Sequence, residues 1–363
     1  MSSAFSLILA AFTWARAVSW RSGLQVAAIA LLTWMWVLVW STTDKPDYAA
    51  YQAMYARSER GTRTEVGYWA LSRVAVDVGL SYELFAAVVG AVALLLLTST
   101  IRRYTDNLAY VLVLYFFFPF IYDTIQLRNF LAFSVVFFAL RYLTRKKRLD
   151  WLRFLAAVTL AATFHVASVA YLLFLGPSLL GKKRFSVLVA TSVVAITVAS
   201  ITQPAFVSSA IAGAADEVGL EKLQGYAESA GAQHNLILAA LQLFALLVTA
   251  RLAHIATEET LGGTRADDER ARFVRLSVWW LAGLLIFFPT YLVNSNFWRI
   301  PRNALVVTYL VAAIARDVAG PGMWRKTKGT ALILLLVIAN VVRVIPRWSE
   351  LFYPLLESSL LWR

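Results

Sequence analysis

The feature that most constrains this chain is a stretch at 154–181 that has no charged side chain and a single histidine, His165. Basic clusters bound it at 145–148 and 182–184. In a membrane protein both clusters belong on the cytoplasmic side, so the 33 residues between them must cross the membrane an even number of times. As helix they span roughly 50 Å, too long for one crossing of a ~30 Å core and short for two full ones. The sequence therefore predicts a tight hairpin with His165 near its outer end.

The composition also indicates a polytopic membrane protein. Of the 363 residues, 60% are hydrophobic and 15% are charged, and the mean hydropathy of +0.66 lies outside the range of a soluble domain. Apolar runs lie at 4–14, 24–40, 84–100, 108–121, 130–140, 154–164, 166–180, 187–201, 236–250, 276–293, 304–315 and 331–342. They predict an all-α polytopic integral membrane protein with about 12 transmembrane or re-entrant helices, several shorter than the ~20 residues of a standard span.

The distribution of charge predicts how the chain is oriented. If the loop at 16–21 is cytoplasmic, alternation places a net charge of +14 on the cytoplasmic side and −1 outside, with both termini outside. The total of +13 thus indicates orientation and contact with lipid headgroups, and not binding to nucleic acid. The outer loops are expected near 41–83, 202–234 and 294–303, with a short interfacial helix at 216–230. Without an internal repeat or low-complexity linker, we expect a single transmembrane domain over 1–363.

The outer loop after the second run carries the first candidate site. Pro46 suits the first turn of a helix and Asp44 its N-cap. On such a helix Asp47, Tyr51 and Tyr55 share a face at four-residue spacing, so a carboxylate stands beside two phenols that can hold sugar hydroxyls. The alternative is a capped interfacial helix whose tyrosines belong to the aromatic belt.

An arginine on the less basic face is the next candidate. Arg128 lies at the apex of a second hairpin, because the 37 residues between Arg103 and Arg141 again have basic ends on the cytoplasmic side. An arginine this close to hydrocarbon needs an anionic partner or a water-filled cavity, which indicates a functional group. The alternatives are an ion pair with Asp123 and snorkelling to lipid phosphate.

Arg299 and Arg302 occupy the apex of a third hairpin. Guanidinium groups bind phosphate oxygens bidentately, so arginines from separate hairpins, these two and Arg128, could converge on a pyrophosphate. Arg302 taken alone is more typical of a headgroup anchor.

His165 and Glu65 are candidates for proton transfer. The unperturbed pKa of histidine, near ~6.5, suits a general base, although a lone histidine in an apolar helix is more often a hydrogen-bonded packing residue. Glu65, with Tyr68 close behind, forms a second acidic and aromatic group, and a glutamate in an outer loop is usually solvated. A carboxylate from Asp47 or Glu65 could take the proton in place of His165, and the residues leave that choice open.

Taken in order, these motifs resemble the EpsG family of Wzy-like exopolysaccharide polymerases. The family pattern is an early Asp-Tyr-x-x-Tyr, a Glu-x-Gly-aromatic, an Ile-Arg-Gln, a Phe-His followed by small residues, and a late Arg-Ile after an aromatic. The corresponding segments are Asp47-Tyr48-Ala49-Ala50-Tyr51, Glu65-Val66-Gly67-Tyr68, Leu127-Arg128-Asn129, Phe164-His165-Val166-Ala167-Ser168 and Phe297-Trp298-Arg299-Ile300. Leu127 and Asn129 depart from the family's Ile and Gln, which leaves the arginine chemistry in place and puts the role of the amide in question.

The resemblance implies a glycosyltransferase-C-like membrane enzyme that joins polyprenyl-diphosphate-linked oligosaccharides at the outer leaflet of the bacterial cytoplasmic membrane. The expected site comprises catalytic His165, Asp47 and Glu65; diphosphate-binding Arg128, Arg299 and Arg302; and sugar-binding Tyr48, Tyr51, Tyr68 and Asn296. The arginines would stabilise the leaving diphosphate, and the scheme requires no metal or cofactor. The expected partners are the lipid-linked oligosaccharide, membrane lipid and a chain-length regulator, with no nucleic acid.

Two other functions remain open at this stage. A lipid-linked oligosaccharide flippase or other transporter would place charges along a path through the membrane. The candidate site residues of this chain are instead expected to cluster at one face of the membrane. A ligase that moves glycan to another acceptor shares the donor chemistry and is not separated from a polymerase. The chain has no cysteine, which excludes disulfides, thiolate metal sites and a cysteine nucleophile.

Overall fold

The computed structural model of the protein describes residues 2–18, 24–57, 65–145, 147–203, 232–258, 265–292, 295–326 and 328–357. Within these ranges the chain forms α- and 3-10 helices and no strands, which confirms the predicted all-α class. The helix expected at 216–230 lies outside the described residues.

The elements follow one another along the chain as helices of very different length. The first half contains α1 (Ser2–Val18), α2 (Leu24–Ser41), α3 (Tyr48–Ala56), α4 (Val66–Asp77), α5 (Tyr82–Tyr104), α6 (Leu108–Phe117), α7 (Phe120–Ile125), α8 (Leu127–Thr144), α9 (Asp150–Phe164), η2 (Val166–Leu175) and α10 (Gly176–Leu179). The second half contains α11 (Lys182–Thr202), α13 (Ala232–Glu258), α14 (Arg265–Gly283), η4 (Leu284–Phe287), η5 (Pro289–Leu292), η6 (Ser295–Trp298), α15 (Arg299–Asn303), α16 (Leu305–Lys326), α17 (Gly329–Val344), η7 (Ile345–Arg347) and α18 (Trp348–Glu357).

Six helices among the described residues are long and apolar enough to cross a membrane. They are Tyr82–Tyr104, Leu127–Thr144, Lys182–Thr202, Leu236–Thr257, Asp268–Tyr291 and Gly329–Arg347. Shorter apolar helices lie at Phe5–Ala15, Val26–Ser41, Leu108–Phe117 and Val166–Leu179. The predicted run at 108–121 is not one helix, because Pro119 has no amide hydrogen to continue α6 and the chain restarts as α7.

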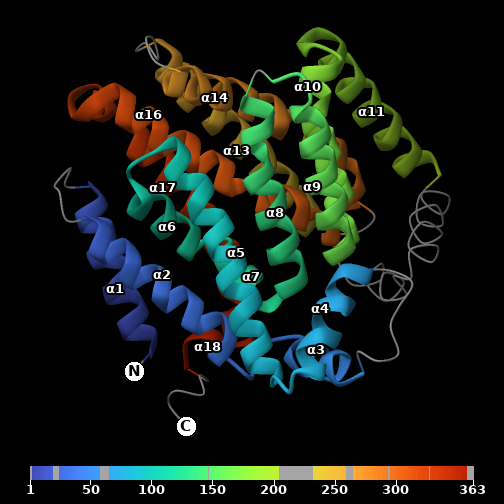
Figure 1. Ribbon diagram of the computed structural model, residues 1–363. Coiled ribbons are helices and arrows are strands. Elements are labelled where there is room, and N and C mark those ends of the chain that lie inside the picture. Colours follow the sequence, from blue (N-terminus) through green and yellow to red (C-terminus); the bar gives the residue numbers. More distant parts are fainter. Residues whose placement is uncertain are drawn as a thin grey trace.

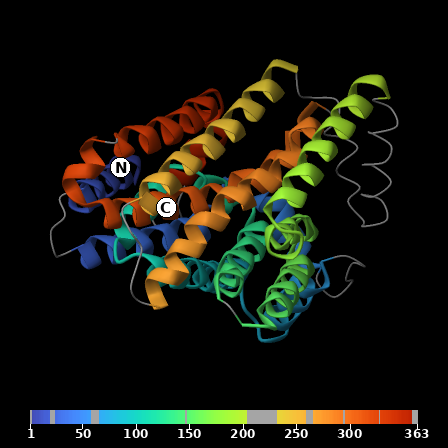
Figure 2. The ribbon, with the colours of Figure 1, turned by 90° about the horizontal axis from the view of Figure 1, so that it is seen from above.

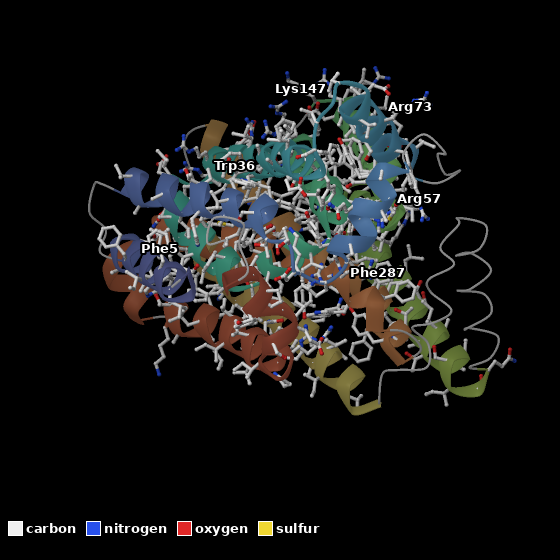
Figure 3. All side chains as sticks on the ribbon, turned by 90° about the horizontal axis from the view of Figure 1, so that it is seen from below. Phe5, Trp36, Arg57, Arg73, Lys147 and Phe287 are labelled. Atoms are coloured by element: carbon white, nitrogen blue, oxygen red, sulfur yellow. The ribbon has the colours of Figure 1, made fainter. Side chains whose placement is uncertain are left out.

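Helices α5, α8 and α9 pack side by side, and the short helices α3 and α4 lie at one end of them (Figure 1). In the predicted orientation this end faces outward. Helix α11 lies along the edge of the molecule, and only 17% of its apolar window is buried (Figure 2). Arg57 and Arg73 mark the margin formed by α3 and α4, where both side chains are exposed (Figure 3). The outer end of α9 is thus covered by α4 and carries the turn at His165.

Polar tethers connect helices inside the bundle. The hydroxyls of Tyr104 and Thr144 lie 2.8 Å apart, and those of Thr249 and Thr308 lie 2.9 Å apart. Such interhelical hydrogen bonds contribute on the order of 0.6 kcal/mol each in membrane proteins. The larger part of the packing energy comes from the apolar cluster, in which residues 108–115 of α6 and the first three turns of α16 are buried on all sides.

The turn between α2 and α3 differs from the sequence-based expectation. Helix α3 begins at Tyr48, and its N-cap is Asp47 in the left-handed region with φ 63°, so the predicted cap at Asp44 is wrong. The turn is held by Lys45, which is buried and donates from Nζ to the carbonyl of Val39 at the end of α2. That bond satisfies one of the open carbonyls of α2, so 42–47 closes a turn before the next helix starts.

Candidate functional site

A buried carboxylate, a histidine and an arginine from three segments meet at the N-terminal end of α4. The Nδ1 of His165 lies 2.6 Å from Oε1 of Glu65, and Nη1 of Arg128 forms an ion pair with Oε2 of the same carboxylate. Glu65 and His165 are each 7% exposed. The pairing of Arg128 with Asp123, considered from the sequence, is wrong, because Asp123 accepts instead from the hydroxyl of Tyr115 at 2.5 Å.

The backbone at Glu65 and Gly67 explains how the carboxylate reaches His165. Glu65 precedes α4 in the left-handed region, with φ 56° and ψ 36°, which costs roughly 1–2 kcal/mol for a residue with a side chain. A Cβ on Gly67 would lie 2.2 Å from Oγ1 of Thr163, so only glycine lets α4 approach the end of α9 this closely. The Glu-x-Gly motif therefore places its glutamate against the histidine that follows α9.

His165 is positioned by the end of its own helix. Its backbone is extended, with φ −153° and ψ 114°, and its amide still donates to the carbonyl of Ala161 at 2.9 Å. The chain then continues as the 3-10 helix η2. The turn directs the imidazole toward Glu65 and leaves it at the apex of the hairpin predicted from the charge-free stretch.

Two tyrosines surround the guanidinium of Arg128. The Cζ of Arg128 lies 5.1 Å from the ring centroid of Tyr51 and 5.8 Å from that of Tyr68, and its Nε donates to the hydroxyl of Tyr51 at 3.4 Å. Cation–π contacts of this kind contribute on the order of 0.5–2 kcal/mol when partly desolvated. The structure thus brings together five of the residues predicted for the site: Tyr51, Glu65, Tyr68, Arg128 and His165.

The environment fixes the protonation of the Glu65 and His165 pair. Burial raises the pKa of Glu65, but the hydrogen bond from His165 and the charge of Arg128 outweigh it and hold that pKa below its usual value. Burial lowers the pKa of His165, and the charges of Arg299 and Arg128 act in the same direction against the Glu65 contact. The pair is therefore an ionised carboxylate and a neutral imidazole, with the proton assigned to Nδ1 from the hydrogen-bond network. Within the described residues Nε2 is buried and has no hydrogen-bond partner, so it carries an available lone pair.

A second polar cluster joins the apices of the other two hairpins. Arg302 is 3% exposed, and its Nη2 donates to Oε1 of Gln126 at 2.9 Å and to Oδ1 of Asn303 at 3.1 Å. The side-chain amide of Asn303 donates to Oδ1 of Asn129 at 3.0 Å. Asn129, which replaces the family's glutamine, thus provides an amide that ties α8 to α15. Arg302 lies deeper in the protein than the Glu65 cluster, with its guanidinium 4.3 Å from the ring centroid of Tyr122.

The remaining predicted site residues lie around these two clusters. Arg299 begins α15 and is near enough to influence the pKa of His165. Asp47 is exposed at the start of α3, and the hydroxyl of Tyr48 donates to the carboxylate of Glu83 on α5. The side chain of Asn296 lies outside the described residues.

The sequence reasoning missed two residues near the site, Glu83 and Arg343. Glu83 lies in the first turn of α5, after the N-cap Ser81. An acidic residue is common at such a position, so it gave no signal of a site. Arg343 lies in the last turn of α17, and its Nη2 reaches the hydroxyl of Tyr122 at 3.5 Å. The signal that could have found Arg343 is its occurrence on the outer side, where arginines are fewer.

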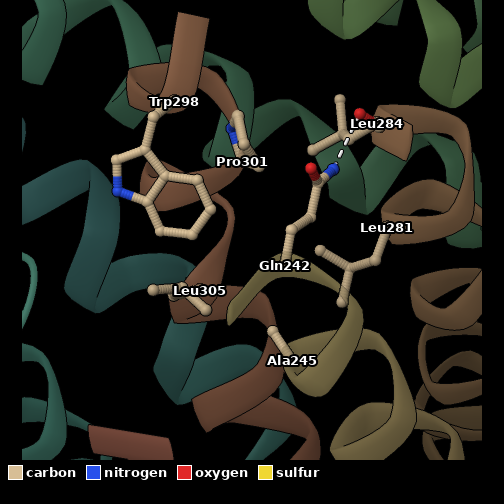
Figure 4. A pocket seen from close by; sticks show the side chains of 7 residues that line it. All are labelled: Gln242, Ala245, Leu281, Leu284, Trp298, Pro301 and Leu305. Atoms are coloured by element: carbon tan, nitrogen blue, oxygen red, sulfur yellow. Dashed lines mark hydrogen bonds between the residues drawn. The ribbon is translucent and has the colours of Figure 1, made fainter. Parts of the chain in front are cut away.

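An apolar pocket lies behind α15. It is lined by Gln242, Ala245, Leu281, Leu284, Trp298, Pro301 and Leu305 (Figure 4). Gln242 is fully engaged, since its Nε2 donates to the Leu284 carbonyl at 2.7 Å and its Oε1 accepts from Tyr291 at 2.7 Å. The pocket borders the segment that carries Arg299. Within the described ranges, no group of three or more histidine, aspartate and glutamate side chains is placed to hold a metal ion.

A family comparison covers nearly all of the chain. The model of the EpsG family matches residues 24–355, a range that includes every residue of the two clusters. No curated protein and no solved structure matches the chain. The family match, together with the six apolar helices, shows that this is a membrane protein.

Proposed function

The chain belongs to the EpsG family, and from that membership we propose that it is an exopolysaccharide polymerase. In this proposal it joins polyprenyl-diphosphate-linked oligosaccharide repeat units at the outer leaflet of the bacterial cytoplasmic membrane. The growing chain on its lipid diphosphate is the donor, and a sugar hydroxyl of a new lipid-linked unit is the acceptor. We place the protein in the membrane as a multi-pass, glycosyltransferase-C-like bundle in which the twelve apolar runs cross or re-enter.

The observation that carries the proposal is the buried contact between Glu65 and His165. An ionised carboxylate that accepts from Nδ1 holds the imidazole in the tautomer whose Nε2 is basic. Nε2 can then take the proton of the acceptor hydroxyl as its oxygen attacks the anomeric carbon of the donor. General base catalysis of this kind contributes typically 10²–10⁴-fold to the rate. Asp47, which is exposed, is the weaker candidate for the same proton.

The leaving group departs as the lipid diphosphate when the bond between its oxygen and the anomeric carbon breaks. Arg128 and Arg299 both act electrostatically on His165, so they lie where negative charge would develop. Arg128, which also contacts Glu65 and Tyr51, and Arg299 both supply guanidinium groups to the phosphates in this scheme. Tyr48, Tyr51 and Tyr68 would offer ring faces and hydroxyls to the sugars.

The decisive experiment is incubation of the purified protein in nanodiscs with a lipid-linked repeat unit. A ladder of lipid-linked products that differ by one repeat unit supports a polymerase. Transfer of the glycan to an unrelated acceptor without a ladder would assign a ligase. Movement of intact substrate between leaflets without a new glycosidic bond would assign a flippase and overturn the proposal.

A further inference from the structure

Two guanidinium groups, those of Arg302 and Arg343, contact one tyrosine, Tyr122 on α7. Arg302 lies over the ring of Tyr122 at 4.3 Å, and Arg343 reaches the hydroxyl of the same tyrosine from α17. Arg343 also faces the ring of Trp298, 5.8 Å from its centroid. Two elements, α15 and α17, thus bring positive charge to one tyrosine on α7.

The protein offsets this charge only in part, because one carboxylate, Asp123, acts on two arginines' worth of positive charge through Arg302 alone. Within the described residues neither Arg302 nor Arg343 forms an ion pair, and both have a buried Nε without a hydrogen-bond partner. Asp123 is the carboxylate that acts on Arg302, and one of its oxygens is taken by Tyr115. A buried guanidinium with unused donors requires an anion or a wet cavity near hydrocarbon.

The position of this cluster relative to the first is fixed by α8. Gln126 accepts from Arg302 at the start of that helix, whereas Arg128, two residues later, reaches Glu65. Gln126 is the N-cap of α8 and Arg128 is its second residue, so the start of one helix contributes a side chain to each cluster. They are neighbouring clusters with separate hydrogen-bond partners.

Two separate anion sites match the substrates of the proposed polymerase, on which this inference rests. Each reacting molecule carries a lipid diphosphate. The donor's diphosphate must lie at the reacting carbon, beside His165. The acceptor's diphosphate stays intact at the far end of its oligosaccharide and must be held away from that carbon.

We propose that Arg343, Arg302 and Tyr122 form a second phosphate site that holds the diphosphate of the acceptor substrate. Arg343 is the partly exposed member and meets the phosphate first, through the guanidinium hydrogens that do not bond Tyr122. Arg302, which is buried, supplies a second positive charge. The same chemistry would also attract the phosphate of a bilayer lipid, so the test must separate these two sources.

Binding is tested with farnesyl diphosphate as the probe, titrated by calorimetry into the protein in phosphatidylcholine nanodiscs. We expect two bound molecules for the unsubstituted protein and one for Arg343→Gln. Arg347→Gln is the matched control, since Arg347 is exposed and pairs with Glu350 in the neighbouring turn. One bound molecule in the unsubstituted protein, or two in Arg343→Gln, overturns the second site. This measurement stands even if no polymer is formed.

Kinetics then separate the acceptor from the donor. With a lipid-linked acceptor, Arg343→Gln should raise KM for that acceptor about tenfold or more, because charge-assisted bonds to phosphate are lost. With the same oligosaccharide freed from its lipid diphosphate, the variant and the unsubstituted protein should react equally. Equal losses with both acceptors would refute the assignment.

A headgroup anchor predicts a different pattern. The melting temperature of the unsubstituted protein would then rise in phosphatidylglycerol nanodiscs, Arg343→Gln would lose that rise, and probe stoichiometry would not change. That outcome would overturn the acceptor site while leaving the polymerase proposal untouched. Failure of every preparation to form polymer, with two probe molecules still bound, would instead defeat the polymerase and leave the phosphate site standing.

Discussion

Nδ1 of His165 and Oε1 of Glu65 lie 2.6 Å apart although the two residues are 100 positions apart in the chain. The contact joins the turn that follows α9 to the start of the short helix α4. It leaves the second nitrogen of the imidazole free of protein partners within the described residues. An orienting carboxylate and an unpartnered Nε2 are the parts that a general base requires.

The first prediction concerns the orienting carboxylate. Glu65→Gln should keep a side chain of the same size but remove the charge that holds the imidazole tautomer and pairs with Arg128. We expect the turnover number to fall by roughly 10²–10⁴ while the protein remains folded. Chain elongation and thermal melting are measured together. Glu350→Gln, at an exposed pair, is the control and should behave as the unsubstituted protein.

The second prediction is the pH dependence. The pKa of His165 lies below its usual value, so the imidazole is neutral and competent at neutral pH. The activity should not change with pH near neutrality. It should decrease only when the pH falls through the lowered pKa of His165. The low folded pKa values of Glu65 and His165 also mean that their contribution to stability is present above the unfolded values and is lost on acidification. In His165→Gln the residual rate should no longer show this acid limb; an unchanged acid limb would assign it to another group.

The third prediction tests the close approach of α4 to α9. Gly67→Ala would place a Cβ within 2.2 Å of Thr163, so α4 must move away and carry Glu65 from His165. We expect loss of most activity and a lower melting temperature, both measured in the same preparation. Thr163→Ala alone should be mild, and combined with Gly67→Ala it should restore part of both. A fully active Gly67→Ala protein would show that the packing does not position Glu65.

The sequence predicted the helical fold better than it predicted which candidate site residues contact one another. Apolar runs and basic clusters reveal helices and turns because they reflect burial and orientation in a membrane. Nothing local in the chain could show that Arg128 pairs with Glu65, 63 positions away, because that contact depends on how hairpins pack. The start of α3 was misplaced because Pro46 suits a first helical turn, whereas in the structure Lys45 bonds back to α2 and the helix begins at Tyr48.

The two clusters show a further limit of motif reading. Arg128, Arg299 and Arg302 were expected to converge on one pyrophosphate, yet Arg302 contacts Gln126, Asn303 and Tyr122. Arg343 belongs to no motif, so only its contact with Tyr122 marks it. Geometry therefore divides one predicted pyrophosphate site into two neighbouring groups of arginines.

The fourth prediction separates charge from shape at the leaving group. Arg128→Lys and Arg299→Lys keep a positive charge, but an ammonium cannot reproduce the planar, bidentate binding of a guanidinium to phosphate oxygens. We expect each variant to lose most polymer formation with normal expression. Arg73→Lys, on the exposed side of α4, is the control. Near-normal polymer length from either site variant would remove that arginine from the leaving-group role.

The last prediction is the orientation of the bundle, which decides the leaflet on which the site works. Because the chain has no cysteine, single cysteines can be introduced and labelled without background. The exposed positions Gln52 on α3 and Ser349 on α18 should react with an impermeant thiol reagent added to intact cells. Lys147, in the basic turn between α8 and α9, should react only after the membrane is opened, since the charge division of +14 against −1 places that turn inside. Each cysteine variant must first be shown to retain elongation activity, so that labelling reports the working fold. The reverse pattern, with Lys147→Cys labelled in intact cells and Gln52→Cys protected, would invert the bundle and place Glu65 and His165 at the cytoplasmic face, where an outer-leaflet substrate could not reach them.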